Sequence, residues 1–268
     1  MKNKFSGYLL VSDMDATLLS SDHSISEKNR NAIKYFTDNG GLFTVATGRM
    51  VDAVKSYMPN LHINAPAVLH NGAKLYDFKN DTVIFEKFIE EDRKNAIRRV
   101  HDDFPEVGLE VYSNEIVYVY RKCEETKRFL TRNYEVIHEL PENVWNEPWI
   151  KVLLIGEKEL LDKYEPIYRK NYDSGYAVRS GDRYLDVVAN GVSKGKGVQT
   201  LMDNLGIETK KVVVVGDNMN DISMLSVAGT SFAVKNGEEA AKKAADMIAP
   251  SNNENAIAYI VEYIEKNL

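Results

Sequence analysis

The sequence has only one cysteine, Cys123, among its 268 residues. An internal disulfide is therefore excluded, and the composition fits a reducing compartment such as the cytoplasm. Proline is also scarce, with 7 residues, whereas aromatic residues make up 10% of the chain, so long disordered stretches are not expected. No apolar run approaches the length of a membrane span, and the run after the N-terminal lysines is too short for a secretory leader. We therefore expect a cytoplasmic protein with no membrane partner.

Clusters of basic residues are missing as well. The chain carries 34 lysine and arginine residues against 40 aspartate and glutamate residues, which gives a net charge of -6. This balance argues against a face that binds nucleic acid, because such faces gather many positive charges. An anionic substrate would have to be attracted locally, by a metal ion and a few lysine or arginine side chains.

Apolar residues make up 44% of the chain, enough for one large hydrophobic core or two modest ones. In residues 1–82 and 187–268, short apolar runs alternate with amphipathic stretches, a pattern typical of βαβ units around a parallel sheet. Residues 83–186 have the mixed pattern of a separate α+β domain. We therefore predict an α/β fold, with a Rossmann-like, doubly wound parallel sheet core and an inserted α+β domain.

Individual elements follow from the same patterns. Ser26 can cap a helix, Gly206 follows the end of another, and the pair Asn71 and Gly72 is a strong signal for a hairpin turn. We expect core strands at residues 8–12, 42–46 and 211–215, core helices at 26–39 and 194–205, and inserted helices at 90–103 and 123–133 with a hairpin at 108–120.

Two acidic loops follow apolar runs near opposite ends of the chain. Asp13 and Asp15 come after the strand expected at residues 8–12, and Asp217 and Asp221 come after the strand expected at residues 211–215. In open α/β sheets the carboxyl ends of the strands line the ligand crevice. Alternate residues of an extended chain point the same way, so Asp13 and Asp15 are expected to converge. Carboxylates held together need a cation or a shared proton, so the loops predict a cation site that performs chemistry.

Two further loops, one with Thr47 and Gly48 and one with Lys194, carry groups that suit phosphoryl transfer. Thr47 offers a hydroxyl and Gly48 an unhindered backbone N–H to phosphate oxygens, and Lys194 offers a positive charge to the same oxygens. Asp13 and Asp217 are the oxygen ligands that a hard cation such as Mg²⁺ prefers. A carboxylate nucleophile that forms an aspartyl-phosphate would divide a difficult hydrolysis into two easier steps.

These four loops, in this order, resemble those of the haloacid dehalogenase superfamily. The large insert resembles the type IIB cap of the Cof-type sugar-phosphate phosphatases, and the likeness extends over essentially the whole chain, including residues 192–195 and 234–236. One position departs from the family pattern, because Ala16 stands where the family usually has glycine. A β-carbon there matters little if the φ angle is negative.

The resemblance implies a role for each matching residue. Asp13 would be the nucleophile, and Asp15 the general acid that then becomes the general base. Thr17 would fix the first acidic loop. The phosphoryl oxygens would be held by Thr47, Gly48, Lys194 and Asn220. Mg²⁺ would be bound by Asp13, the backbone carbonyl of Asp15 and Asp217, with Asp221 either a direct ligand or a neighbour of the ligands.

Several assignments stay open at this point. Either Lys194 or Lys196 could face the site, and the family match favours Lys194. Asp221 could instead cap the helix that follows it. Arg49 and Asn71 are possible substrate contacts, although a helix start explains the first and a turn the second.

The sequence as a whole predicts a Mg²⁺-dependent phosphatase that acts on a small phosphorylated metabolite, with sugar phosphates as the favoured class. A phosphomutase built on the same core is one alternative. A phosphate-binding regulatory protein without turnover is another. We expect a monomer or a weak homodimer, with neither nucleic acid nor membrane as a partner.

Overall fold

The computed structural model describes residues 3–131, 134–173 and 175–267. The chain divides into two compact units. Unit 1 comprises Met1–Arg49, Lys55–Phe85 and Ser193–Leu268, and unit 2 comprises Met50–Val54 and Glu86–Val192. None of the helices in the described parts of the chain has the length and apolarity that a membrane crossing requires.

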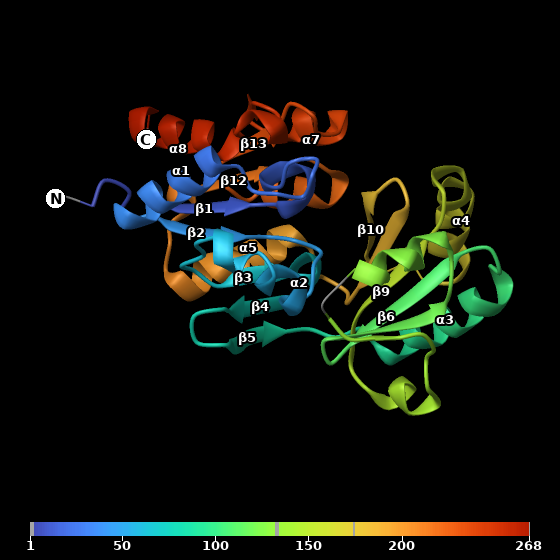
Figure 1. The fold of residues 1–268 in the computed structure, drawn as a ribbon. Helices are drawn as coiled ribbons and strands as arrows, with labels where there is room; N and C mark the ends of the chain where they lie inside the picture. Colours follow the sequence, from blue (N-terminus) through green and yellow to red (C-terminus); the bar gives the residue numbers. More distant parts are fainter. Residues whose placement is uncertain (1–2, 132–133, 174, 268) are drawn as a thin grey trace. The chain divides into compact units, whose positions relative to one another are not determined.

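A parallel sheet of five strands forms the centre of unit 1 (Figure 1). β1 lies between β12 and β2, and every pair of neighbours in the sheet is parallel. The strands are buried because helices cover them, which explains their continuous apolar sequences. The predicted parallel core is therefore confirmed. The sheet order is β14 (Met247–Ala249), β13 (Thr230–Val234), β12 (Val212–Gly216), β1 (Leu9–Ser12) and β2 (Leu42–Val45).

Helices lie on both sides of this sheet. Figure 1 shows α1 (Glu27–Asp38) and α8 (Ala256–Asn267) on one side and α5 (Lys194–Leu205) on the other. The Ser26 hydroxyl accepts a hydrogen bond from the Asn29 N–H at the start of α1, and Gly206, with φ of 65°, caps the end of α5. Both predicted helix boundaries are confirmed. Three shorter helices complete the unit: α2 (Val51–Lys55), which begins in unit 2, α6 (Ile222–Leu225) and α7 (Glu239–Ala244).

A small second sheet in unit 1 contains the predicted turn. β3 (Ala67–Leu69) and β4 (Lys74–Asp77) pair antiparallel, and the short 3-10 helix His70–Gly72 joins them. His70, Asn71 and Gly72 all have positive φ angles, a conformation that glycine and asparagine adopt more readily than other residues. β5 (Thr82–Glu86) extends this sheet and was not predicted.

Unit 2 is a mainly antiparallel sheet with two long helices, in which only the edge pair β7 and β8 is parallel, and this confirms the predicted α+β pattern. α3 (Glu91–Asp103) and α4 (Lys158–Asn171) pack on a hydrophobic core that includes Trp149 and Tyr168. The predicted helix at residues 123–133 is a 3-10 helix over Glu124–Thr131, and residues 132–133 lie outside the described residues. The sheet order is β10 (Ala177–Gly181), β11 (Tyr184–Val188), β9 (Trp149–Ile155), β6 (Gly108–Ser113), β7 (Ile116–Arg121) and β8 (Val136–Ile137).

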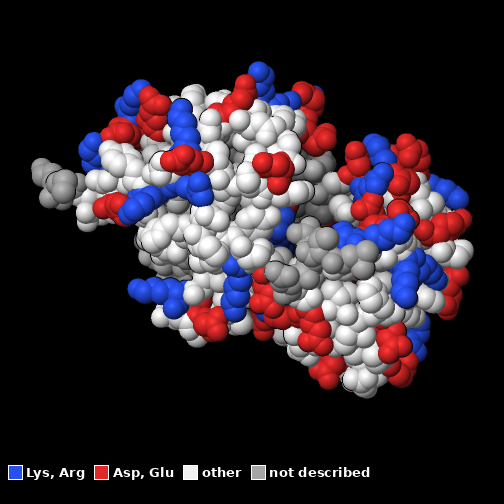
Figure 2. Space-filling model, in the orientation of Figure 1, with Lys and Arg blue, Asp and Glu red and all other residues white. Residues whose placement is uncertain are grey.

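Acidic and basic side chains are interspersed over both units on the face drawn in Figure 2. This distribution agrees with the nearly balanced charge of the sequence, which contains 34 basic and 40 acidic residues. On the drawn face of each unit, acidic and basic side chains are therefore mixed.

The start of α5 is packed directly against the backbone of α6. Gly195 donates its N–H to the Ser223 hydroxyl at 3.0 Å, and a β-carbon on Gly195 would lie 2.2 Å from the Ser223 carbonyl oxygen. Real β-carbons do not approach a carbonyl oxygen so closely, so only glycine fits here. This contact fixes the first turn of α5, where Lys194 is located.

Replacing Gly195 with alanine should therefore lower the free energy of unfolding by about 2 kcal/mol, because the new methyl group forces α5 away from α6. Chemical denaturation followed by circular dichroism measures this change. Lys196→Ala is the matched control, since Lys196 is exposed in the same helical turn and its loss should change stability by less than about 0.5 kcal/mol. Equal stabilities for the two variants would contradict the expected clash.

Candidate active site

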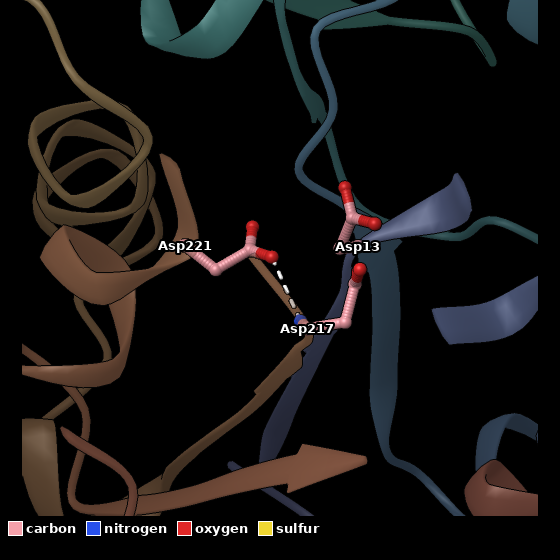
Figure 3. A group of neighbouring side chains, drawn as sticks. All are labelled: Asp13, Asp217 and Asp221. Atoms are coloured by element: carbon pink, nitrogen blue, oxygen red, sulfur yellow. Dashed lines mark hydrogen bonds between the residues drawn. The ribbon is translucent and has the colours of Figure 1, made fainter. Parts of the chain in front are cut away.

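Three carboxylates meet at the carboxyl ends of two neighbouring strands (Figure 3). Asp13 follows β1, Asp217 follows β12, and Asp221 ends the short turn after β12. One oxygen from each of the three lies within 4.8 Å of the others, and all three side chains are buried. Figure 3 shows the carboxylates of Asp13 and Asp217 pointing toward one another. The two acidic loops predicted to meet therefore do meet.

Burial makes ionisation of this cluster unfavourable. It raises the pKa of Asp13 well above the ordinary value, and the neighbouring carboxylates raise that pKa further. Burial and the charge of Asp221 raise the pKa of Asp217 to about 7. Carboxylates so close together, with so little water, need positive charge to remain ionised.

Lys194 supplies positive charge to two members of the cluster. Its Nζ donates hydrogen bonds to Asp13 Oδ1 at 2.5 Å and to Asp221 Oδ1 at 2.6 Å. Burial opposes the charge of this ammonium group, yet Asp13 and Asp221 raise the pKa of Lys194 above its ordinary value. Lys194 is 2% exposed, whereas Lys196 lies on the surface, so it is Lys194 that reaches the acidic cluster.

Asp221 holds the second acidic loop in shape. Its Oδ2 accepts hydrogen bonds from the backbone N–H groups of Asp217 at 2.8 Å and Asn218 at 2.9 Å, while its Oδ1 accepts from Lys194. These contacts form a capping box with Asn218 around the turn Met219–Asp221. The capping alternative for Asp221 is thus present in the structure, and both of its oxygens already have partners.

Thr17 connects the two acidic loops. Its hydroxyl donates a hydrogen bond to Asp217 Oδ1 at 2.7 Å, and both side chains are buried. The first loop therefore also positions a carboxylate of the second loop, which no spacing in the sequence indicates.

The position of Ala16 corrects one expectation. Ala16, which lies between Asp15 and Thr17, has φ of 57° and ψ of 6°, so its backbone is in the left-handed region. A β-carbon in this region costs about 1–2 kcal/mol, which gives a physical reason for glycine at this place in related proteins. The Asn236 side chain donates a hydrogen bond to the Ala16 carbonyl at 2.8 Å and helps to hold the turn.

Asp15 does not join the buried cluster. Arg49 donates Nε–H to Asp15 Oδ2 at 2.8 Å and Nη2–H to Asp15 Oδ1 at 2.5 Å. Burial opposes the charge of Asp15, yet these hydrogen bonds lower its pKa. The Asp15 side chain is 52% exposed, and the Arg49 guanidinium lies over the ring of Tyr57. Asp15 therefore pairs with Arg49 and lies outside the group formed by Asp13, Asp217 and Asp221, although its charge still acts on Asp13.

The remaining predicted residues form a second group beside the first. Thr47 Oγ1 accepts a hydrogen bond from the Arg49 N–H at 3.2 Å, and the Thr47 carbonyl accepts one from the Asn71 N–H at 3.0 Å. Asn220 Nδ2 donates to Asn71 Oδ1 at 3.1 Å. A β-carbon on Gly48 would lie 3.2 Å from Asn71 Oδ1, so Gly48 and Asn71 are in close contact.

Comparison with known proteins identifies the family. Residues 10–261 match the model of the haloacid dehalogenase-like hydrolases. The chain belongs to this family. This hydrolase is 30% identical over 256 residues to a putative phosphatase of Haemophilus influenzae, covering 94% of this chain and 96% of that protein. It is 25% identical to 5-amino-6-(5-phospho-D-ribitylamino)uracil phosphatase of Bacillus subtilis, covering 95% of this chain and 94% of that protein.

Solved structures agree with the fold of this haloacid dehalogenase-like hydrolase. A crystal structure of a Thermotoga maritima protein has a TM-score of 0.80 at 29% identity, covering 96% of this chain and 97% of that one. A subclass IIB sugar phosphatase of the same superfamily has a TM-score of 0.82 at 22% identity, covering 96% of this chain and 98% of that one. The predicted family, enzyme class and fold are therefore confirmed.

In this hydrolase, replacing Ala16 with glycine should raise the free energy of unfolding by about 0.5–1 kcal/mol, because glycine adopts positive φ without the steric cost. Denaturant titration of both proteins measures the difference.

Ala240→Gly is the matched control for this change. Ala240 lies inside α7, where the same substitution should lower the free energy of unfolding by about 1 kcal/mol. A loss of stability at both positions would show that strain at Ala16 is not relieved by glycine.

Proposed function

We propose that this haloacid dehalogenase-like hydrolase is a Mg²⁺-dependent phosphatase. Its substrate would be the phosphate monoester of a small metabolite, with sugar phosphates as the favoured class. The observation that carries the proposal is the buried cluster of Asp13, Asp217 and Asp221 with Lys194 bound to it. The names of the relatives support the reaction class, and one of these names refers to a phosphate ester on a ribityl chain.

Asp13 is the nucleophile in this proposal. One of its carboxylate oxygens attacks phosphorus while the bond from phosphorus to the ester oxygen breaks, and Asp15 gives a proton to the departing alkoxide. Water then attacks the aspartyl-phosphate, and Asp15 takes a proton from that water as phosphate leaves. The hydrogen bond from Lys194 favours the ionised, nucleophilic form of Asp13.

The acidic cluster suits a divalent cation. Asp13 and Asp217 face each other with little solvent around them, and burial raises the pKa of both groups in the absence of an ion. We propose that these two carboxylates hold Mg²⁺ together with the backbone carbonyl of Asp15, and that Asp221 binds beside them or orients their loop. When bound, Mg²⁺ supplies positive charge that the carboxylates and the phosphoryl oxygens share.

The phosphoryl oxygens need donors, and the predicted residues retain some. Lys194 has three N–H groups, of which two are used by Asp13 and Asp221, so one remains for a phosphoryl oxygen. Asn220 uses one amide hydrogen on Asn71 and keeps a second. We assign phosphate binding to these groups, to the Thr47 hydroxyl and to the Gly48 backbone.

The ion pair between Asp15 and Arg49 suits only the second chemical step. Arg49 favours the ionised form of Asp15, which can accept a proton from water. The first step requires the protonated form, which cannot accept two strong hydrogen bonds from a guanidinium equally well. We therefore propose that Asp15 leaves Arg49 when the substrate binds, and that Arg49 positions Asp15 between turnovers.

The remaining parts of the proposal concern the whole chain. We assign catalysis to residues 1–82 and 187–268, and substrate selection to a type IIB cap at residues 83–186. We place the enzyme in the cytoplasm as a monomer or weak homodimer, consistent with its single cysteine.

Replacing Asp13 with asparagine should lower phosphate release by roughly 10³-fold or more, because the amide is a poor nucleophile. Release is measured with p-nitrophenyl phosphate and with a panel of sugar phosphates, in the presence of Mg²⁺. Asp203→Asn, an exposed substitution in α5, is the control and should retain full activity.

Two outcomes would contradict the proposed reaction. Normal phosphate release by Asp13→Asn would show that Asp13 is not the nucleophile. Conversion of one sugar phosphate into an isomer without free phosphate, after priming by a bisphosphate, would indicate a phosphomutase.

Excess Mg²⁺ should raise the melting temperature by on the order of 5 °C, because it binds the folded cluster and not the unfolded chain. Differential scanning fluorimetry with and without a chelator measures the gain. Asp217→Asn should abolish the gain, whereas Asp203→Asn should retain it. A gain of equal size in Asp217→Asn would place the ion elsewhere.

The same experiment has a predicted dependence on pH. Folding raises the pKa of Asp217 from its ordinary value to about 7, so ionisation of Asp217 costs stability in the folded, metal-free protein. That cost is absent in strong acid, grows as pH rises and is complete above about pH 7. In chelator, Asp217→Asn should therefore gain stability over the natural protein most clearly at pH 8, and a constant difference across pH would contradict this.

A further inference from the structure

Asn71 lies where three of the predicted loops meet. Its backbone N–H donates to the Thr47 carbonyl at 3.0 Å, and its Oδ1 accepts from Asn220 Nδ2 at 3.1 Å. The next residue, Gly72, packs so closely on the chain before α5 that a β-carbon there would lie 2.0 Å from the Ser193 carbonyl oxygen. Asn71 therefore contacts the loops after β2 and β12 and adjoins the start of α5.

The amide nitrogen of Asn71 is a buried donor without an acceptor. The side chain is 1% exposed, and Nδ2 has no hydrogen-bond partner among the described residues. A buried amide N–H without an acceptor costs free energy comparable to a lost hydrogen bond, so native proteins rarely keep one without a reason. An acceptor that arrives with a ligand would remove this cost.

The turn alone does not explain this side chain. Asn71 has φ of 56°, and glycine would adopt that conformation at least as well. Asn255 has a similar left-handed backbone conformation, with φ of 65°, and serves as a structural comparison. Its Oδ1 accepts a hydrogen bond from the Ser26 hydroxyl. The turn accounts for the backbone of Asn71, but it does not account for a buried donor in contact with Gly48.

We propose that Asn71 binds the phosphoryl group of the substrate, with Nδ2–H donating to one of its oxygens. This inference rests on the proposed phosphatase function and adds a residue to it. The ligand would be a tetrahedral oxyanion, either a phosphate monoester or the free phosphate product. Asn71 Oδ1 keeps its hydrogen bond from Asn220, so Asn71 also orients the Asn220 amide toward the same group.

Two substitutions separate the donor from the turn. Asn71→Asp keeps an oxygen that can accept from Asn220 and tolerates positive φ, but it replaces the donor with a negative charge. Asn71→Gly keeps the turn and removes the side chain. Asn255→Asp and Asn255→Gly are matched controls, because Asn255 has the same backbone conformation in the same unit.

Isothermal titration with inorganic phosphate, in the presence of Mg²⁺, measures binding directly on the full chain. Asn71→Gly should weaken phosphate binding by about tenfold, the loss of one hydrogen bond to a charged group. Asn71→Asp should weaken it by about 100-fold or more, because like charges then face each other. The Asn255 variants should bind within twofold of the natural protein. Steady-state kinetics should show a matching rise in the inhibition constant of phosphate.

Each outcome decides the matter. Phosphate affinity within twofold of the natural protein in Asn71→Gly would overturn the inference, and this variant decides alone if Asn71→Asp does not fold. A natural protein that hydrolyses esters while both Asn71 variants keep their affinity would leave the proposed function intact and remove only this residue from it. A natural protein that binds phosphate but hydrolyses no ester would refute the proposed function, and the titrations would still test Asn71. No phosphate binding by the natural protein would overturn the inference.

Discussion

Repulsion among buried carboxylates is the constraint on which this structure depends. Asp13, Asp217 and Asp221 offer oxygens within 4.8 Å of one another, and water does not screen them. Lys194 reduces the repulsion only because α5 begins beside them, and Gly195 allows that start to touch Ser223 in α6. The parallel pairing of β1 with β12 brings the two acidic loops to one place. The repulsion among these carboxylates is thus reduced by an ion pair whose position depends on the sheet register and on the contact at Gly195.

The elements that the sequence predicts well are those whose local signals agree with their burial. β1, β2 and β12 are short apolar runs because helices cover both faces, and Ser26 and Gly206 mark helix ends through their backbone chemistry. In β5 the local signal and the burial disagree, since its sequence contains strand-forming valine, isoleucine and phenylalanine but all five of its side chains are exposed or half-buried. α7 has only six residues, which is too short for a helical period to be recognised.

The site shows a similar division. Spacing and strand context predict that Asp13, Asp217 and Lys194 lie at one site, because these residues stand at the ends of strands or at the start of a helix. The pairing of Asp15 with Arg49 and the positive φ angle at Ala16 have no signal in the spacing of the sequence. Which of Lys194 and Lys196 faces the site depends on how the first turn of α5 is oriented, because the two side chains leave the helix in different directions. Side-chain directions of this kind are not encoded in residue spacing, so the structure was needed to establish them.

Local charge balance connects the site to its proposed chemistry. Three carboxylates, Asp13, Asp217 and Asp221, against one ammonium group, Lys194, leave two negative charges when all four are ionised. A phosphate monoester is itself a dianion near neutral pH, so it would be repelled from this cluster and also by a chain of net charge -6. One divalent cation would cancel the excess of the cluster. Without it, the raised pKa values of Asp13 and Asp217 would keep protons on the groups that are proposed to attack phosphorus and to hold the ion. A cation at this cluster would therefore favour the ionised carboxylates that the proposed reaction uses.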